Sequence, residues 1–409
     1  MHHARAHRLL YLACLAASGG AFGQPVPAPN PDRPWYVFAQ QEVKHMTNAL
    51  DGAKGSEISD TLYTTSLGGG LNARFGRQRA YANGSLSYTR YADIDGIDGQ
   101  GYNLGAGLDW ETIGNLSGDL TAAAGRTQAD FNTGINTLRL KNTEKFEELG
   151  ARVLWGGVSL LGIEGRTGWR RVNFSAPEFA SREYEQGSAS AGVIYRPSSA
   201  LTLGTGLSFQ ATDYDVPAFG QSEPDSSERR DVYVQADWTA TGASTVGARL
   251  NFGKTDYDRP NADDFSGVTG SAYWRWRPTG RTSVSTTISR DTGQESGFQR
   301  LVSGDRTRLT ATDFSRVTNL FALAVTYDLT GKIVLTGKVD HARRSLVDTL
   351  TNGKGRDNTT LATLRADWAV TRIITVGCEI GHETRSASGF GSFDYSGNHV
   401  GCLGRVTID

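Results

Sequence analysis

The sequence predicts an all-β protein: one closed antiparallel up-and-down transmembrane β-barrel of about 18 strands, with both termini periplasmic. Three observations lead to this prediction. Glycine supplies 50 of the 409 residues, and glycine is a poor helix former. Turn signals recur at intervals of roughly 40 residues. Between the turns, apolar and polar residues alternate, as they do in strands whose two faces meet different surroundings.

The composition excludes some classes of function. Lys and Arg together number 42 and Asp and Glu 43, which gives a formal net charge of -1. Because this leaves no basic field, nucleic acid is not an expected partner. The chain is 38% hydrophobic and 10% aromatic, which is too apolar for a disordered protein.

Residues 1–23 have the pattern of a secretory signal peptide. Basic residues precede the apolar stretch 9–17, and Ala21-Phe22-Gly23 is a small-x-small cleavage site. A lipoprotein signal ending at Cys14 is disfavoured, because the apolar segment before it would be too short. After cleavage, the expected location is the outer membrane of a Gram-negative envelope. Beyond this leader no run of about 18 apolar residues predicts a transmembrane helix.

The mature chain divides into two parts. Residues 24–34 carry five of the eleven prolines and are expected to form a polyproline-like tether. Residues 35–409 form the predicted barrel.

Eight short turns and nine long loops are predicted to join eighteen strands of about 14 residues each. The long loops include residues 93–99, 132–137, 217–226, 259–264 and 348–355. The short turns are Phe75-Gly76-Arg77, Ile113-Gly114-Asn115, Trp155-Gly156-Gly157, Arg196-Pro197-Ser198, Thr241-Gly242-Ala243, Pro278-Thr279-Gly280, Leu329-Thr330-Gly331 and Thr371-Arg372.

The strands are long and two-faced. Segments 231–238, 269–277 and 332–341 each place apolar residues on one face and polar or charged residues on the other. Strands of globular proteins usually have about 5 to 6 residues, whereas a tilted membrane-crossing strand needs about 9 to 11. In lipid the backbone has no water to bond, so such a sheet must close on itself. Barrels of about 16 to 18 strands are wide enough for an aqueous channel.

An aromatic residue stands near the end of every strand that enters a short turn. Core packing would spread aromatics along the strands, whereas an aromatic girdle at one membrane interface gathers them at one level. This girdle, expected on the periplasmic side, consists of Phe75, Trp110, Trp155, Tyr195, Trp238, Trp276, Tyr327 and Trp368.

Three segments resemble a known family: 75–91 (FGRQRAYANGSLSYTRY), 102–119 (YNLGAGLDWETIGNLSGD) and above all 264–281 (DFSGVTGSAYWRWRPTGR). They are similar to the β-barrel porins encoded with exopolysaccharide biosynthesis genes, the EpsL-like outer-membrane proteins. The resemblance extends from about residue 35 to the end of the chain. It implies a role in exporting a polysaccharide or assembling it at the cell surface.

The chain departs from that family at two places. Residues 45–50 (HMTNAL) replace the acidic Asp-Asn-Leu pattern expected in the first strand, which bears on the substrate. Residues 406–409 (VTID) contain no terminal aromatic residue, which affects how well the barrel-assembly machinery recognises the last strand.

The polar faces supply the candidate lumen. Arginine ladders facing acidic rows would set a transverse field and bind anionic or polyhydroxylated sugars. The alternative is that the same residues form ion pairs that only brace and hydrate the wall. Alternation places Trp274 and Trp276 on the lipid face and leaves Tyr273 for sugar stacking. The candidates are Arg152, Glu164, Arg166, Arg170, Asp237, Tyr273, Arg275, Arg277, Lys338, Asp340, Arg365 and Asp367.

The sequence gives little support for catalysis. His45, His341, His382 and His399, the histidines beyond the leader, lack the spacing of a metal site. No Gly-x-Ser-x-Gly elbow or His-Glu-x-x-His motif is present, although catalytic residues dispersed around the rim would escape such a search. We therefore expect no enzyme, no catalytic residues, no metal and no cofactor.

Cys378 and Cys402 are candidates for a disulfide. If the last hairpin turns near Phe390, the two cysteines oppose each other on the outward face. Opposed residues have Cα atoms about 4.5 to 5.5 Å apart, within disulfide range, and the envelope is oxidising. The alternative is a pair of reduced, lipid-facing thiols.

The sequence thus favours a porin-like component of exopolysaccharide export or surface assembly. The alternatives are a general diffusion porin for small solutes and, in another class, a rim enzyme or a structural surface barrel with a plugged lumen. Expected partners are outer-membrane lipid, the barrel-assembly machinery, periplasmic export components and the polysaccharide itself.

Overall fold

The structure is a computed structural model that describes eight stretches of the chain: residues 34–129, 141–216, 223–258, 265–292, 295–303, 306–347, 354–389 and 392–409. The predicted signal peptide and residues 24–33 of the tether lie outside the described residues. So do the predicted loops 132–137 and 259–264.

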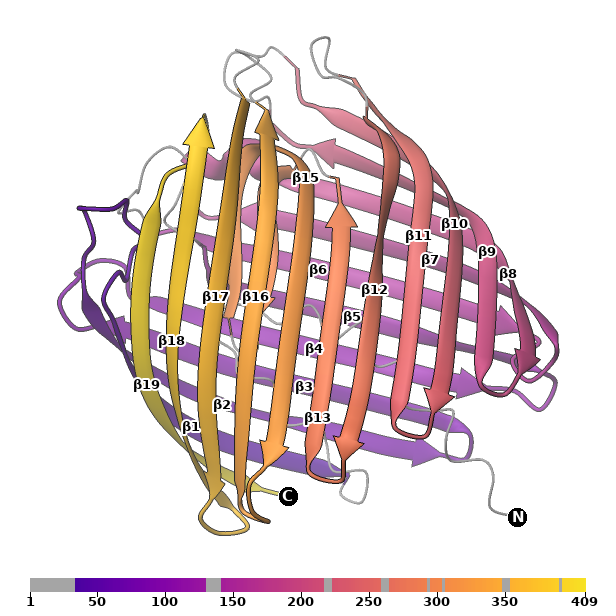
Figure 1. Cartoon of the computed structure of the whole chain (residues 1–409), viewed down its shortest axis with the longest axis horizontal. Helices are drawn as coiled ribbons and strands as arrows, with labels where there is room; N and C mark the ends of the chain where they lie inside the picture. The colour runs from indigo at the N-terminus through magenta and orange to yellow at the C-terminus, as the bar shows by residue number, and fades with distance from the viewer. Residues whose placement is uncertain are drawn as a thin grey trace.

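The described chain is built from strands, with a short 3-10 helix, η1, in one loop (Figure 1). In chain order the elements are β1 (Trp35–Met46), β2 (Asp60–Phe75), β3 (Gln78–Tyr91), β4 (Gly99–Glu111), β5 (Leu116–Gln128), β6 (Thr143–Trp155), β7 (Leu161–Phe174), η1 (Pro177–Arg182), β8 (Tyr184–Ser198), β9 (Leu201–Tyr214), β10 (Ser226–Thr241), β11 (Ser244–Tyr257), β12 (Phe265–Thr279), β13 (Thr282–Asp291), β14 (Glu295–Ser303), β15 (Arg306–Asp328), β16 (Ile333–Val347), β17 (Lys354–Ala369), β18 (Ile374–Gly389) and β19 (Tyr395–Ile408).

These strands form one closed antiparallel sheet. Each strand pairs with its chain neighbour, and β1 pairs with β19 to close the ring, from Val37 opposite Ile408 to Met46 opposite His399. Nineteen assigned strands make an eighteen-stranded barrel, because β13 and β14 pair with successive parts of β15. The predicted closed barrel of about eighteen strands is confirmed.

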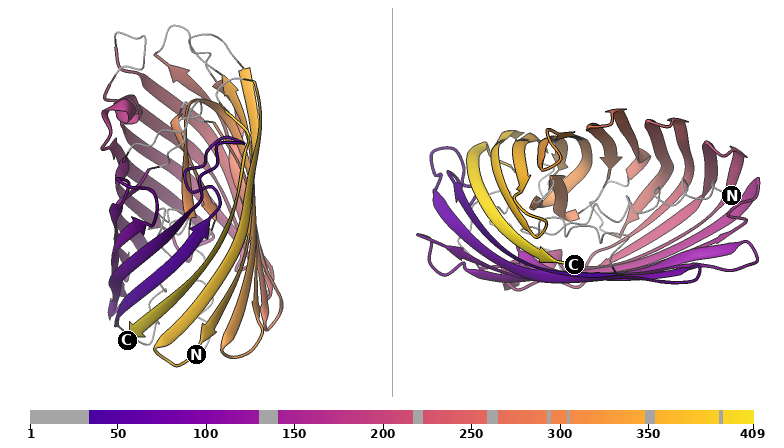
Figure 2. Two further views of the ribbon diagram at one scale, coloured as in Figure 1. Left: turned by 90° about the vertical axis from the view of Figure 1, so that its left-hand side faces the viewer. Right: turned by 90° about the horizontal axis from the view of Figure 1, so that it is seen from below.

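Opposite walls of the barrel run in clearly different directions in Figure 1, as expected for tilted strands seen through the ring. The barrel is flattened in the view from below in Figure 2. The pairing of Val37 with Ile408 places both described chain ends at the end with the short turns.

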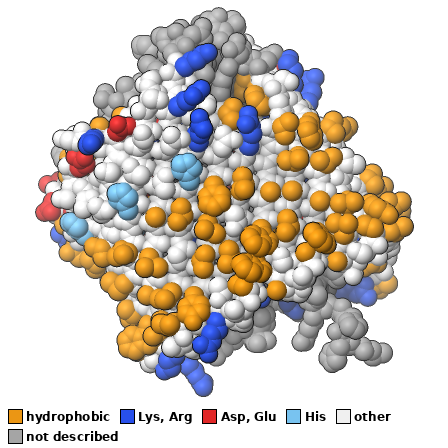
Figure 3. Space-filling model, viewed as in Figure 1, with side chains coloured by type: hydrophobic (Ala, Val, Ile, Leu, Met, Phe, Trp, Pro, Cys, Tyr) orange, Lys and Arg blue, Asp and Glu red, His pale blue; other side chains and the backbone are white. Residues whose placement is uncertain are grey.

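The predicted alternation decides which side chains face outward. On β10, Val232 and Trp238 are 49% and 52% exposed, whereas Tyr233 between them is 3% exposed. Exposed apolar side chains form a broad band on the outer surface (Figure 3). A soluble protein rarely exposes apolar surface of this extent, and lipid would cover it.

All eight predicted short turns join neighbouring strands. Gly76 and Gly156 adopt positive φ angles of 62° and 78° in these turns, a conformation that L side chains rarely take. Two prolines expected in connections instead lie at strand ends. Pro197 falls within a register shift of β8, and Pro278 within one of β12, where the ladder needs no amide donor.

The opposite end of the barrel carries the long loops, which are packed by two small apolar clusters. One cluster joins Leu50 to Ile94 and Ile97, and the other places Phe179 of η1 against Phe146. Asp60 lies beneath the first cluster and accepts hydrogen bonds from the backbone amides of residues 92, 93 and 94, at 3.1, 3.1 and 3.0 Å.

The structure joins Cys378 and Cys402 in a disulfide. The two residues are directly opposed on β18 and β19, and their Cα atoms are 4.1 Å apart. Both side chains are exposed on the outward face of the barrel.

We expect the unfolded protein to show no reactive thiols until reductant is added. The Cys378→Ser/Cys402→Ser variant should lose about 3 kcal/mol of unfolding free energy, because the bond closes a loop with a sequence separation of 24. Thiol labelling in denaturant and urea unfolding in lipid vesicles measure the two effects. Two reactive thiols in the untreated protein would contradict the bond.

Asp60→Ala should open the loop at residues 92–98. The substitution leaves the amides of residues 93 and 94 without their acceptor, while the amide of residue 92 still donates to the Thr61 carbonyl; the cost is about 1 to 3 kcal/mol for a buried unsatisfied group. Limited proteolysis of the folded barrel should then cleave this loop. Asp60→Asn keeps one acceptor oxygen and serves as the matched control with a smaller effect. Equal resistance of the wild type and Asp60→Ala would refute this role.

Candidate functional site

The inward faces of the strands hold the charged residues that the sequence assigned to the lumen. On β6 and β7, Glu164 is 2% exposed and lies between two arginines. Nη2 of Arg152 is 2.6 Å and Nε of Arg166 is 2.7 Å from its carboxylate oxygens. Arg170 pairs with Glu148 at 3.0 Å. Here, the arrangement is that of a bracing ladder.

The predicted residues on β16 and β17 have different surroundings. Arg365 donates to both carboxylate oxygens of Asp367 at 2.8 Å. Asp340 is 5% exposed, and Lys338 on the same inward face is half-buried. Arg277, in contrast, is exposed beside the short turn after β12. Most of the predicted set therefore lines the wall, and Arg277 lies at its rim.

A second predicted group meets on β10 and β12. The Tyr273 hydroxyl donates to Oδ1 of Asp237 at 2.8 Å, although β11 lies between the two strands. Gly247 of β11 is directly opposite both residues, and a Cβ there would overlap the tyrosine ring and the carboxylate. The tyrosine can thus lie flat against the wall because glycine leaves the space.

This arrangement recurs around the lumen and accounts for six of the 50 glycines. In each case an inward aromatic ring lies over the glycine directly opposite on the neighbouring strand, where a Cβ would overlap it. The pairs are Tyr36 with Gly70, Phe38 with Gly68, Tyr81 with Gly107, Phe146 with Gly125, Tyr233 with Gly206 and Tyr273 with Gly247.

Arginines cover several of these rings. A guanidinium over an aromatic face gains cation–π attraction and keeps its donors free at the edge. Measured from the guanidinium carbon to the ring centroid, the stacks are Arg249 over Tyr233 at 3.8 Å, Arg385 over Tyr395 at 4.5 Å, Arg275 over Tyr273 at 4.8 Å, Arg79 over Tyr81 at 5.1 Å and Arg405 over Phe38 at 5.2 Å.

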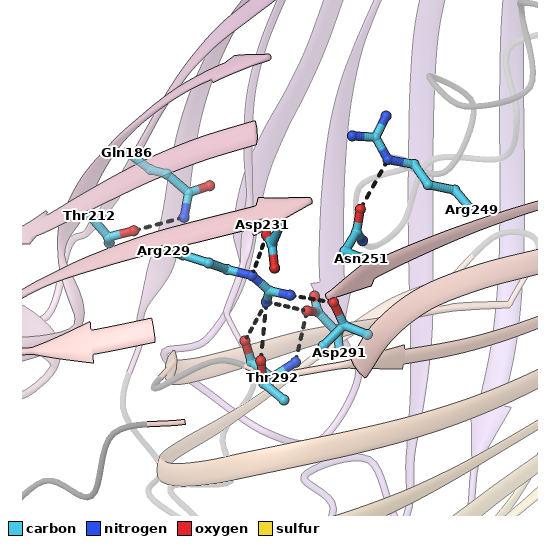
Figure 4. A network of polar contacts seen from close by, with 9 residues as sticks. Gln186, Thr212, Arg229, Asp231, Arg249, Asn251, Asp291 and Thr292 are labelled. Atoms are coloured by element: carbon cyan, nitrogen blue, oxygen red, sulfur yellow. Dashed lines mark hydrogen bonds and ion pairs between the residues drawn. The ribbon is translucent and has the colours of Figure 1, made fainter. Parts of the chain in front are cut away.

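Arg249 and Arg275 lie on adjacent strands and differ from the ladder arginines. Within the part of the chain that the structure describes, neither has a carboxylate oxygen within 4.0 Å. Arg249 donates to Oδ1 of Asn251 at 3.1 Å, a neutral partner (Figure 4). These two stacks place positively charged groups without a direct ion-pair partner on the lumen wall at β11 and β12.

Sequence reasoning missed a polar cluster centred on Arg229, which Figure 4 shows from close by. This arginine of β10 contacts Asp231 at 2.8 Å, Asp291 at 3.5 Å and the Thr292 hydroxyl at 3.1 Å, and it also bonds to Thr269. It ties β10 to β12 and to the end of β13. The alternation along β10 could have predicted this cluster, because Arg229 and Asp231 stand on the same face of the strand as Tyr233.

Two further inward groups were also missed. Arg344 and Asp357 form a buried bidentate pair between β16 and β17, with Nε to Oδ1 at 2.8 Å. Glu379 bonds to Lys44 at 3.4 Å and to His399 at 2.9 Å near the closing strands. Both groups tie neighbouring strands together from inside, as internal ion pairs do.

A hairpin occupies part of the lumen near the long loops. β14 and the first part of β15 pair from Glu295 opposite Ser315 to Ser303 opposite Arg306. β14 contacts η1 and β16, and Figure 2 shows this hairpin inside the ring of strands. The passage is therefore narrowed at this level.

The predicted girdle residues stand at the short-turn end. Trp155, Trp238 and Trp368 are exposed on the outward face. Trp274 and Trp276 also face outward, and their rings stack at 5.3 Å. The remaining members lie at the end of their strands or within three residues of it: Phe75 in β2, Trp110 in β4, Tyr195 in β8 and Tyr327 in β15.

Among the described residues, no cluster of His, Cys, Asp and Glu side chains could hold a metal ion. His45, His341 and His382 face outward and bond to Thr61, Thr360 and Asn398 on neighbouring strands, at 3.1, 2.8 and 2.8 Å. A helix long and apolar enough to cross a membrane does not occur in the described part of the chain.

A family model described as "Putative beta-barrel porin 2" matches residues 39–406, nearly the whole barrel. The chain belongs to this porin family. Its fold is accordingly that of a porin-like outer-membrane β-barrel, and the exopolysaccharide association is no part of the family description. No curated protein sequence matches this porin.

Solved structures similar to this porin share little sequence with it. The outer membrane protein OpdK of Pseudomonas aeruginosa is 12% identical, with a TM-score of 0.48 over 91% of this chain and 99% of that one. OccAB3 of Acinetobacter baumannii is 9% identical, with a TM-score of 0.47 over 92% and 98%. The FrpB iron transporter of Neisseria meningitidis is 9% identical, with a TM-score of 0.45 over 92% and 82%.

Gly247→Ala should displace the Tyr273 ring and break its bond to Asp237, because the new methyl group takes the space that the ring uses. We expect a loss of about 1 to 3 kcal/mol in unfolding free energy, typical of overpacking. Gly337→Ala is the matched control, since nothing lies within 4 Å of the added Cβ. Urea titration of both variants in lipid vesicles makes the comparison. Equal stabilities would show that the ring does not need the glycine.

Proposed function

We propose that this porin is a conduit through which an anionic or polyhydroxylated polysaccharide crosses the outer membrane during exopolysaccharide export or surface assembly. The observation that carries the proposal is the repeated stack of arginine on a flat aromatic ring along the lumen wall. The protein acts in this proposal by binding and guiding, without catalysis or a cofactor.

The chemistry of these stacks suits sugar chains. The apolar faces of sugar rings pack on aromatic rings, and guanidinium donors bond to sugar hydroxyls and carboxylates. Several weak contacts arranged along a wall let a chain slide, because each contact is easily exchanged for the next. Arg152 already pairs with a carboxylate, as do the other arginines of the ladder. These arginines therefore stabilise the barrel wall and have fewer donors left for a sugar chain.

The proposed orientation places the short turns and both termini in the periplasm and the long loops outside. The aromatic residues at the short-turn end would then meet the periplasmic interface of the outer-membrane lipid. In this orientation the barrel-assembly machinery inserts the chain after signal-peptide cleavage. Periplasmic export components would deliver the polysaccharide to the short-turn end.

The Arg249→Ala/Arg275→Ala variant should lose anion preference and sugar-dependent block. Neither arginine has an ion pair with a described carboxylate, so their loss removes positive charge from the lumen wall and the reversal potential in a salt gradient should shift toward cations. Removal of two hydrogen-bonding cations should weaken block by an acidic oligosaccharide about tenfold or more. Single-channel recording in planar bilayers measures both effects.

Arg230→Ala is the control for this experiment, because Arg230 lies on the outer surface and pairs with Glu228 at 2.6 Å. Unchanged block in the double variant would refute sugar binding at these stacks. Open, unselective conductance in the wild type would instead support a general diffusion porin. Deletion that abolishes secreted polysaccharide while solute uptake persists would separate export from diffusion.

A further inference from the structure

The outer surface carries a cationic patch that the lumen function does not use. Arg290 of β13, Arg343 of β16 and Arg356 of β17 are exposed on the outward face near the long loops, and Lys354 begins β17 beside them. Figure 3 shows Lys and Arg side chains gathered on this part of the surface, above a row of histidines. We call these four residues the outer basic patch.

The strand register brings the patch together. Arg290 and Arg343 are both directly opposite Asn319 of β15, one from each side. Neighbouring strands lie about 4.8 Å apart, so the two Cα atoms are separated by about 10 Å. Arg356 pairs with Ser345, two residues along β16 from Arg343. Long guanidinium side chains at this spacing can converge on one phosphate group.

The patch lacks acidic neighbours on its own face. No described carboxylate faces outward on the loop-side halves of β13 and β15–β18, and Asp291, next to Arg290, bonds to Arg229 on the lumen side. Several other cations on the outer surface have a carboxylate partner. Lys145 lies 2.7 Å from Glu147, and Lys254 pairs with Asp256.

Directly beneath the patch lies the apolar band. Ile288, two residues before Arg290, is 55% exposed, and Leu364 on β17 is 54% exposed. Outward positions between the band and the patch carry hydroxyl, amide and imidazole groups, including Thr360 and His341. Along one set of strands, the surface thus changes from apolar to polar to cationic toward the long loops.

We propose that the outer basic patch binds the phosphate groups of the phosphorylated saccharolipid in the outer leaflet, the lipid A part of lipopolysaccharide. Acyl chains then lie on the apolar band, sugar hydroxyls meet the polar row, and arginines hold the phosphates with bidentate hydrogen bonds. The proposal rests on the orientation given above, in which the long loops face outward, and it is independent of what passes through the lumen.

The test titrates lipid A into the purified full-length mature barrel in non-ionic detergent and counts bound lipid by native mass spectrometry. Arg290→Gln/Arg343→Gln/Arg356→Gln should weaken binding about tenfold or more, as expected for loss of charge-assisted hydrogen bonds. The triple Lys variant at the same positions should retain part of the affinity. Retention of the heat-modifiable folded band on gels shows that each variant is a barrel.

Two comparisons make the result decisive. Lys145→Gln/Arg230→Gln/Lys254→Gln removes three positive charges from outer-surface cations that have carboxylate partners. This control variant should leave lipid A binding unchanged. Dephosphorylated lipid A should bind about tenfold more weakly to the wild type, and inorganic phosphate should not compete at equal concentration. Equal affinity for dephosphorylated lipid A, an equal loss in the control variant, or effective competition by inorganic phosphate would overturn the proposal.

Discussion

Closure of the sheet is the constraint on which the rest of the molecule depends. A strand in lipid has no solvent for its backbone groups, so all of them must be met by neighbouring strands. The pairing of β1 with β19 removes the last two edges. Once the ring is closed, the alternation along each strand separates a lipid-facing surface from an aqueous one.

The eighteen-stranded closed architecture, the turns and the two faces could be predicted from the sequence, because they depend on periodicity and on turn residues. Segment 231–238 alternates in the structure as the pattern indicated, with Val232 outside and Tyr233 inside. The strand ends were less predictable. Pro197 lies within β8 because a bulge there needs no donor, which local composition does not reveal.

The candidate site was predictable only in part. The alternation along their strands predicted that Glu164 and Tyr273 face the inner wall. In the structure the Tyr273 hydroxyl donates a hydrogen bond to Asp237. Which cations lack a carboxylate depends on register between strands, so Arg249 could not be singled out. The position of Gly247 between Asp237 and Tyr273 likewise emerges only when three strands are aligned.

The position of the cysteine pair affects whether the disulfide can be reduced after the barrel is inserted in the membrane. Cys378 and Cys402 are on the outward face, between β18 and the strand that completes the ring, with Val400 and Ile380 exposed beside them. In a bilayer, acyl chains would shield these sulfurs from water-soluble thiols, which exchange only through an accessible thiolate. The disulfide would then form during passage through the envelope and remain oxidised after insertion. The redox state of the two cysteines in the membrane would therefore reflect the redox conditions before insertion.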